Sequence, residues 1–426
     1  MTQFNFSYII YFMEILKRKF LSFLAWSENY TETNMRYVIG GGSWLLGGKI
    51  ALAFISFGLM FVFANWLPRE IYGKYQYVIA IVSLFSLFTL PGIHTSLVKS
   101  VAAGKEGTLR LAVREKMKWG LLGSIFLLGF SAWYFLRENP VLGAAFLMAA
   151  LFLPVLETFN IFLQFWNGRK RFDTQAKYEV FSAFLVALVL IAVIIYVNNN
   201  LLPLLAAFFI GQTFFNWLFY KRTLRQTTNS EEDFKAISFG KHLTIMNTFA
   251  VAAMHIDKVL IWKFLGAAEV AIYSFAWLPI QKIIGTIPLA SLALPKLAEL
   301  NIKERKRDIF KKFLKLFFGS TTLALFLIFA ASLIYGLLLP QYTESIRYFQ
   351  ALSLLAIMIP FSFLNAALIA DLRQKELYKV TVAPPVLKII LFLLLTPLYG
   401  IWGVVASLLI TQVITSCLIL FYFRKL

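Results

Sequence analysis

The chain has 426 residues, of which 60% are hydrophobic and 15% are charged, and its formal net charge is +20. Soluble domains usually contain about 25% charged residues, so this composition excludes an ordinary soluble protein and favours a helical membrane protein with many spans. The single cysteine, Cys417, excludes a disulfide framework, and the three widely separated histidines exclude a zinc site built from His and Cys.

The N-terminal segment, residues 1–36, contains the run FNFSYIIYFMEILKRKFLSFLAW, in which charged residues interrupt the apolar stretch before it is long enough to span a membrane. This pattern predicts an amphipathic helix on the cytoplasmic surface. A cleaved signal peptide does not fit, because the basic residues follow the apolar run instead of preceding it. A true first residue at Met13 or Met35 is the remaining alternative.

The rest of the chain contains a series of apolar stretches, each about 18 to 25 residues long, which is the length of a membrane-spanning helix. We therefore predict an all-α polytopic membrane protein with about twelve transmembrane helices. These helices are expected at residues 42–65, 75–98, 119–137, 141–165, 178–197, 200–219, 240–264, 270–294, 315–339, 346–370, 380–397 and 400–422.

The basic residues are distributed unevenly among the connections of these predicted helices. Most of the 41 Lys and Arg residues lie near the termini or in even-numbered connections, such as 99–118 and 303–315. Because cytoplasmic loops are enriched in Lys and Arg, both termini are predicted to be cytoplasmic. Topology then explains the positive charge, and nucleic-acid binding is not expected. The odd-numbered connections hold only Arg69, Lys74, Arg137, Lys263 and Arg347.

An internal repeat divides the chain into two parts. FANWLPREIYGKYQYV is similar to IWKFLGAAEVAIYSFA, and TLPGIHTSLVKS is similar to TIPLASLALPKL further along. We predict a six-helix bundle at 37–222, a cytoplasmic linker at 223–239 and a second six-helix bundle at 240–426, with a cavity between the bundles. Such repeats are typical of alternating-access transporters, and chance similarity between apolar segments is the alternative.

Polar residues within the predicted spans are candidates for the lining of this cavity, because intramembrane charge is costly and usually functional. Lys49 and Asn247 occupy equivalent positions in the first helix of each bundle, although Lys49 could instead reach the membrane surface with its long side chain. Asp257 and Lys258 are adjacent on one helix and point about 100° apart. The remaining candidates are His94, Lys282, Lys388, and Glu157, Asn160 and Gln164 on one face of the fourth helix.

The charge balance of these candidates predicts the kind of substrate. Their four lysines outnumber the two firm acids, Glu157 and Asp257, so a cavity lined by them would attract an anion, and lysine suits phosphate oxygens. Proton exchange by one of the acids or by His94 would couple transport to an H⁺ or Na⁺ gradient. No phosphate-binding loop or catalytic constellation is recognisable, so we expect neither an enzyme nor a bound cofactor or metal.

Three segments of the chain carry a resemblance to a known family. They are WLPREIYGKYQY at the first outside turn, HIDKVLIWKFLGAAEVAIYSFA in the seventh and eighth spans, and ASLALPKLAEL at the end of the eighth. The chain from about residue 37 resembles the flippases of O-antigen and capsule repeat units. These flippases belong to the multidrug/oligosaccharidyl-lipid/polysaccharide exporter superfamily.

The resemblance implies a flippase that moves undecaprenyl-pyrophosphate-linked oligosaccharide from the cytoplasmic to the outer leaflet of the bacterial inner membrane. It implies that Asp257 and Lys258 contribute to the cavity or its lateral gate, while Lys49, Lys282 and Lys388 face the pyrophosphate or acidic sugars. The lipid bilayer, a polysaccharide polymerase and a chain-length regulator are the implied partners. The alternatives are an ion-coupled drug exporter or a peptidoglycan-precursor flippase of the same superfamily, and a non-transporting scaffold or glycosyltransferase partner.

Overall fold

The computed structural model describes residues 35–425 except 198–199, 288, 299–301, 303 and 372–373, so nearly all of the predicted N-terminal segment lies outside the described residues. The described chain is helical throughout and contains no strand. The helices of its first part are α2 (Met35–Trp66), α3 (Arg69–Phe85), α4 (Ile93–Ala102), α5 (Thr108–Leu136), α6 (Pro140–Leu156), α7 (Phe162–Gly168), α8 (Phe172–Tyr196) and α9 (Leu201–Leu224).

The second part begins with two helices, α10 and α11, that meet at an angle. Its helices are α10 (Phe234–Met246), α11 (Thr248–Leu265), α12 (Ala267–Thr286), α13 (Leu289–Ala298), α14 (Lys306–Leu338), α15 (Ile346–Ser353), α16 (Phe361–Ala370), α17 (Gln374–Tyr399) and α18 (Ile401–Arg424). Four 3₁₀ segments join some of these helices, namely η1 (Ser86–Thr89), η2 (Phe159–Ile161), η3 (Pro340–Ser345) and η4 (Leu354–Met358).

Membrane-spanning segments dominate the fold, as the sequence predicts. Ten helical segments of the described chain are long and apolar enough to cross a membrane, and α10 with α11 forms an eleventh as a pair bent by 48°. The predicted eighth span corresponds to α12 and α13 and is not among them, because Glu269, Gln281 and Lys282 lower the hydropathy of α12. The all-α fold is confirmed, with ten or eleven such segments in place of about twelve.

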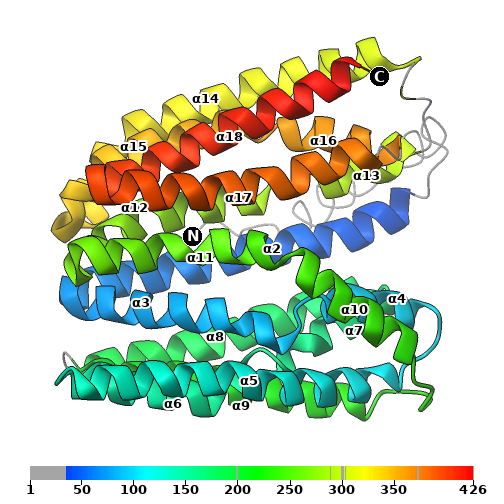
Figure 1. Cartoon of the computed structure of the whole chain (residues 1–426). Helices are drawn as coiled ribbons and strands as arrows, with labels where there is room; N and C mark the ends of the chain where they lie inside the picture. Colours follow the sequence, from blue (N-terminus) through cyan, green and yellow to red (C-terminus); the bar gives the residue numbers. More distant parts are fainter. Residues whose placement is uncertain are drawn as a thin grey trace, which may run out of the picture.

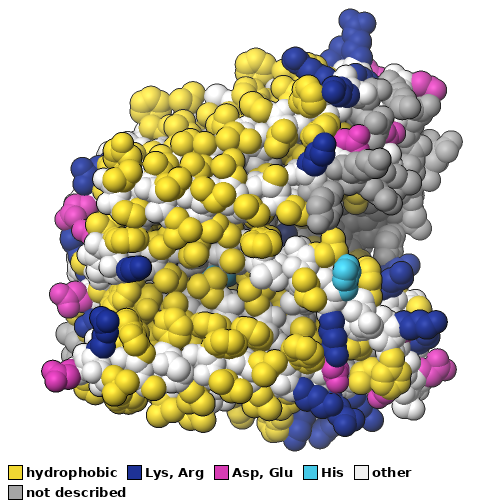
Figure 2. Space-filling view, viewed as in Figure 1, with side chains coloured by type: hydrophobic (Ala, Val, Ile, Leu, Met, Phe, Trp, Pro, Cys, Tyr) yellow, Lys and Arg dark blue, Asp and Glu magenta, His cyan; other side chains and the backbone are white. Residues whose placement is uncertain are grey.

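The long helices run side by side, with most of the first part below and most of the second part above in Figure 1. We call α2–α9 the first half and α10–α18 the second half. One end of the bundle carries α4, α10 and the basic starts of α5 and α14, and we call it the basic end. The opposite end carries the turns between α2 and α3 and between α11 and α12. Figure 2 shows a hydrophobic face between the two ends, with most Lys and Arg side chains toward the basic end.

The hydrophobic core is shared by the two halves at the opposite end and divided at the basic end. The largest cluster joins both halves, and its Tyr72 and Phe275 rings lie 4.6 Å apart between centroids. Two smaller clusters lie toward the basic end. One belongs to the first half with Ile237 of α10, and the other belongs to the second half alone. The halves are therefore joined by packing at one end and separately packed at the other.

Glycines allow the closest approach at each of these junctions. A Cβ at Gly73 of α3 would lie 1.8 Å from the carbonyl oxygen of Ala267 at the start of α12, so only glycine fits there. At the basic end a Cβ at Gly240 of α10 would lie 2.8 Å from Cα of Ile93 on α4. In addition, the Gly92 amide donates a hydrogen bond to Thr244 Oγ1 of α10 over 3.0 Å.

Candidate functional site

Three charged residues on three helices interact electrostatically across the division between the halves. Lys49 of α2 and Lys282 of α12 are exposed, and both lysines act electrostatically on the half-buried carboxyl of Glu179 on α8. Because α2 and α8 belong to the first half and α12 to the second, this group of charges spans the division between them. Two cations around one acid leave a net positive charge, which favours an anionic ligand.

A small cavity of about 150 Å³ continues from Lys282 toward the opposite end. Its walls come from α2, α3 and α12, so it also lies between the two halves. Ser56 and Gln76 bring polar atoms into a lining that is otherwise largely aromatic and aliphatic, and Tyr75 forms part of the wall. Of the three charged residues, Lys282 lines this cavity, and Gln76 on its wall binds Lys258 of α11.

The adjacent pair Asp257 and Lys258 on α11 binds two different helices. Lys258 Nζ donates to Gln76 Oε1 of α3 over 2.7 Å, and Gln76 Nε2 donates to the Tyr72 hydroxyl over 2.9 Å. Asp257 is 1% exposed, and its Oδ2 accepts from the Tyr273 hydroxyl of α12 over 2.6 Å. Asp257 therefore fixes α12 against α11 within the second half, whereas Lys258 ties the second half to the first.

His255 and Lys388 extend this group within the second half. His255 lies one helical turn of α11 away from Lys258, and Asp257, Lys258 and Lys388 all act electrostatically on it. Lys388 on α17 interacts in the same way with Asp257, and its Nζ lies 5.3 Å from the centroid of the Phe392 ring. The structure thus brings Asp257, Lys258 and Lys388 together, and adds His255 to them.

A separate buried polar cluster lies inside the first half. Lys116 of α5 is 0% exposed, and its Nζ lies 3.1 Å from Nε2 of His94 on α4. The Glu157 carboxylate acts electrostatically on Lys116 and accepts a hydrogen bond from Asn160 Nδ2 over 2.8 Å. His94, Glu157 and Asn160 are therefore grouped together, but within one half and apart from the charges between the halves.

The predicted helix face of Glu157, Asn160 and Gln164 requires a correction. α6 contains Pro154 and ends at Leu156, so Glu157 caps it, Asn160 lies on η2, and Gln164 lies on the short helix α7. Proline removes a backbone hydrogen bond and favours such a break. The three residues are consequently not spaced along one continuous α-helix, although residues 140–168 still form one membrane-crossing segment.

Asn247 also occupies a break. It ends α10 and precedes α11, where the two helices meet at 48°, and its side chain is exposed. The structure places Asn247 at this bend, where its side chain forms no hydrogen bond with the charged residues described above.

Sequence reasoning missed Glu179 and Lys116. Glu179 lies two turns inside α8 and next to the apolar run FSAFLVALVL, and it was not counted among the polar residues of the span predicted at 178–197. Lys116 lies two turns inside α5, which begins at Thr108, well before the predicted start at 119. Both residues lie at or just before the start of an apolar stretch. Because a helix can begin before its apolar stretch does, charged residues at that position are candidates for the interior of the helix. Within the described residues, no group of three or more His, Cys, Asp or Glu could hold a metal ion.

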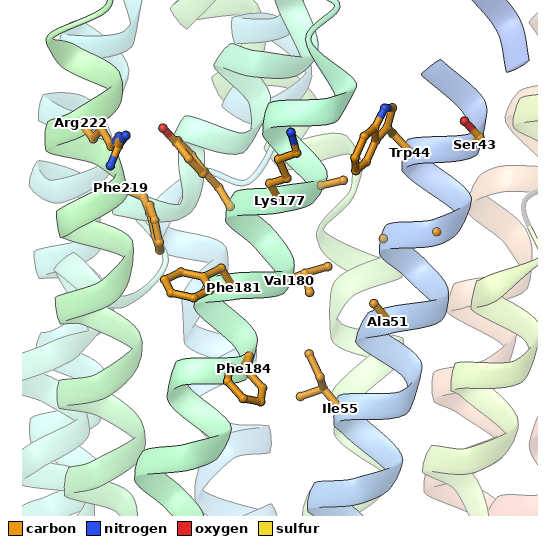
Figure 3. Close-up of a pocket in the computed structure, with 14 residues that line it drawn as sticks. Ser43, Trp44, Ala51, Ile55, Lys177, Val180, Phe181, Phe184, Phe219 and Arg222 are labelled. Atoms are coloured by element: carbon orange, nitrogen blue, oxygen red, sulfur yellow. The ribbon is translucent and has the colours of Figure 1, made fainter. Parts of the chain in front are cut away.

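A wide groove lies beside α2 (Figure 3), and Lys49 is not among the residues that line it. It has a volume of about 940 Å³ and is bounded by α2, α8 and α9. Its lining on α2 includes Trp44, Gly47, Ala51 and Ile55, which recur at helical spacing, while Lys49 is offset by about half a turn from Gly47 and Ala51. The groove and the charged group around Glu179 therefore lie on two sides of the contact between α2 and α8.

Comparison with solved structures shows the fold. The chain is similar to an outward-facing multidrug resistance MATE family transporter of the MOP superfamily, with 13% identity, a TM-score of 0.62, and coverage of 90% of this chain and 94% of that one. It is also similar to the lipid II flippase MurJ in an inward closed conformation, with 13% identity, a TM-score of 0.69, and coverage of 91% and 87%. No curated protein matches the chain significantly.

The family itself is shown by a sequence model described as polysaccharide biosynthesis protein, which matches residues 38–301. This match includes the first half from residue 38 and the second half through α13, and it contains each of the segments on which the resemblance rests. Since more than half of the chain is matched, the chain belongs to the polysaccharide biosynthesis protein family, and it has the fold of the transporters of the MOP superfamily.

Proposed function

We propose that this protein is a flippase that moves undecaprenyl-pyrophosphate-linked oligosaccharide repeat units across the bacterial inner membrane for surface polysaccharide synthesis. The observation that carries the proposal is that Lys49 and Lys282, one from each half, both act electrostatically on the carboxyl group of Glu179. An anionic pyrophosphate can bind both lysines at once. Because the two lysines belong to different halves, a bound pyrophosphate favours the arrangement of the halves in which both lysines reach it.

The division of the core supports alternating access as the mechanism. The halves share one core at the opposite end and have separate cores at the basic end, so a substrate would enter from the basic end in this arrangement. By the distribution of Lys and Arg, that end faces the cytoplasm. Binding to cations of both halves would then favour the rearrangement that closes the basic end and opens the opposite end.

Coupling to an H⁺ or Na⁺ gradient belongs to the same proposal. The candidates for this coupling are the buried Asp257 and the cluster in which His94 and Glu157 lie beside the buried Lys116. The protein acts without a catalytic step of its own, and its substrate would reach a polysaccharide polymerase and a chain-length regulator after release.

The proposal is tested by mass spectrometry of lipids from a strain that lacks the protein, together with staining of the surface glycan. We expect undecaprenyl-pyrophosphate oligosaccharide to accumulate and the surface glycan to disappear. Accumulation of a peptidoglycan precursor instead would assign the protein to that pathway. Unchanged lipids and glycan, in a strain with no second flippase, would contradict the proposal and favour drug export.

The role of the two lysines is tested in the complemented strain. Lys49→Gln and Lys282→Gln each remove one charge-assisted contact, worth about 1.5–3 kcal/mol, so each should slow flipping by about tenfold or more. Lys263→Gln is the matched control, because Lys263 is an exposed lysine of α11 that lies apart from the charged group. Equal rates for all three variants at equal protein levels would remove the assignment.

A further inference from the structure

The groove between α2, α8 and α9 combines apolar walls with two cations at one end. Figure 3 shows Arg222 and Lys177 at the same level as Trp44, with Phe181 below them and Phe184 and Ile55 deepest. Lys177 Nζ lies 4.8 Å from the centroid of the Trp44 ring. A groove that is charged at one end and apolar along its length matches a lipid with an anionic headgroup.

The length and position of the groove match a lipid of one leaflet. Its lining on α2 extends from Ser43 and Trp44 to Ile55. A separation of that many residues corresponds to about 16 Å along an α-helix, which is about half of the roughly 30 Å hydrocarbon core. The charged end lies toward the basic end of the molecule, because α8 starts there and α9 ends there. The groove thus reaches from the headgroups at the basic end to the middle of the membrane.

Both cations are available to a ligand. In the described part of the chain neither Lys177 nor Arg222 forms an ion pair, and the nearby carboxylate of Asp173 is bound by Arg171 over 3.0 Å. Two cations from two helices can bind the two phosphates of a pyrophosphate, with Arg222 supplying its planar fork and Lys177 a point charge. The charge of the groove therefore suits a diphosphate better than a single phosphodiester.

The groove is separated from the charged group between the halves by a single helix contact. Gly48 of α2 lies against Ala176 of α8, where a Cβ on Gly48 would be 3.0 Å from Cβ of Ala176. Lys49 follows Gly48 directly and Glu179 lies three residues after Ala176, and neither residue lines the groove. An apolar stretch of eighteen residues in α2 contains no buried residue. The buried residues of this helix, Val62, Phe63 and Ala64, lie near its other end, so the part of α2 beside the groove is less tightly packed than that end.

We infer that this groove binds the polyprenyl-pyrophosphate part of the substrate before its headgroup enters between the halves, with the pyrophosphate at Lys177 and Arg222 and the prenyl chain along Phe181, Phe184 and Ile55. The inference rests on the proposed function and adds a site for the lipid part of the substrate. Movement of α2 away from Ala176 would then bring the pyrophosphate from Lys177 to Lys49.

Two glycines of α2 provide a test that does not depend on charge. Gly47 lines the groove and Gly58 does not, yet a Cβ at either position would have no atom within 4 Å. Gly47→Leu should therefore fill the groove without disturbing the helix, and Gly58→Leu is its matched control. Binding of undecaprenyl pyrophosphate to the purified full-length chain, measured by native mass spectrometry, should weaken by about tenfold or more in Gly47→Leu and stay unchanged in Gly58→Leu.

The cations are tested by a second pair of variants. Lys177→Gln with Arg222→Gln should weaken binding of undecaprenyl pyrophosphate by about tenfold or more. Arg110→Gln with Arg114→Gln removes the same charge from exposed residues of α5 at the same end, and should leave binding unchanged. Phosphatidylglycerol in excess should displace little of the bound pyrophosphate lipid, because it offers one phosphate.

Full binding by Gly47→Leu, or equal displacement by phosphatidylglycerol, would overturn the inference. These outcomes are distinct from failure of the proposed function. If the groove is not used, the strain lacking the protein still accumulates the lipid-linked oligosaccharide, and Gly47→Leu restores the surface glycan as well as Gly58→Leu does. If the protein is not a flippase for this substrate, the strain lacking it accumulates nothing.

Discussion

At the opposite end, the backbone of α3 lies directly against the backbone of α12, and Lys258 of α11 reaches Gln76 of α3. At the basic end, the contacts between the halves within the described residues are those of α10 with α4 and α5. The first junction joins two long helices of different halves, whereas the second is made by a helix that already bends away from its own half. The comparison indicates that the basic end can open by motion at the bend, with α10 staying on the first half.

Polar contacts strengthen the attachment of α10 to the first half. Lys241 Nζ of α10 lies 2.6 Å from Glu115 Oε2 of α5, and Lys105 Nζ lies 3.3 Å from Asp233 Oδ2 at the start of α10. Asp233 also caps α10 by accepting from the Ala236 amide over 3.0 Å. In this structure α10 therefore packs against the first half, although it is the first helix of the second half.

The largest effect is expected from Gly73→Ala at the opposite end. The added Cβ would collide with main-chain atoms of Ala267, which cannot rotate away, so α3 and α12 must separate. Overpacking of this kind costs about 1–3 kcal/mol or more, which lowers the population of the closed junction by about tenfold or more. Ser56→Cys, in a chain that also carries Cys417→Ser, should then react about tenfold faster with a thiol reagent that is added on the side of the membrane where the opposite end lies.

Gly129→Ala is the control for this change, because a Cβ at Gly129 would have no atom within 4 Å. Alanine also has the better helix propensity by about 1 kcal/mol, so a loss in Gly73→Ala cannot come from the helix itself. Unchanged labelling of the Ser56 position in Gly73→Ala would show that α3 and α12 are not in contact at that end.

A smaller effect is expected from Gly240→Ala at the basic end. Its Cβ would meet Ser96 Oγ at 2.7 Å, and that side chain can rotate, but it would also meet Cα of Ile93 at 2.8 Å. We expect α10 to loosen from α4 with a loss of about 1–2 kcal/mol, measured as a lower thermal unfolding temperature in detergent. Hydrogen exchange should increase in α10 and stay constant in α12. An increase in α12 instead would contradict the independence of the two junctions.

The third effect depends on pH and concerns Glu106, in the connection between α4 and α5. Its Oε1 and Oε2 accept from Arg169 over 2.6 Å each, and Oε2 accepts from the Thr228 amide over 2.7 Å, which ties the segment before α10 to the first half. Burial would raise the pKa of the Glu106 carboxyl, but the hydrogen bonds from Arg169 and Thr228 outweigh it and hold this pKa below its usual value.

The pKa of Glu106 is lower in the folded chain than in the unfolded chain. The ionised carboxylate therefore stabilises the fold fully at a pH above its pKa in the unfolded chain. This stabilisation disappears as the pH falls through its pKa in the folded chain. At pH 7, Glu106→Gln should unfold at a lower temperature than the unchanged chain. The difference should shrink as the pH falls below the usual Glu pKa of about 4.5. Glu231→Gln, an exposed acid in the same segment, is the control. A difference that grows on acidification would contradict the assigned pKa direction.

The sequence predicts features that depend on local composition better than features that depend on packing between helices. The length of the apolar stretches predicted the all-α membrane fold, and the resemblance predicted the family, because both depend on local sequence. The cytoplasmic position of the termini, predicted from the Lys and Arg distribution, stays a prediction. The break at η2 and the burial of Lys116 depend on which neighbouring helices pack against a position, and periodicity does not reveal this. The linker predicted at 223–239 is partly helical for the same reason, since α10 begins at Phe234 and is stabilised by α4.

The smallest effect is expected from the ion pair at the rim of the opposite end, Arg69 with Glu344 over 3.0 Å. Both side chains are substantially exposed, so solvent screens the attraction, and such pairs contribute about 0–1 kcal/mol. Glu344→Gln should therefore lower the unfolding temperature slightly in low salt and not at all near 1 M salt, where the Debye length is about 3 Å. A loss as large as that of Gly73→Ala would mean that charge, and not backbone packing, closes this end.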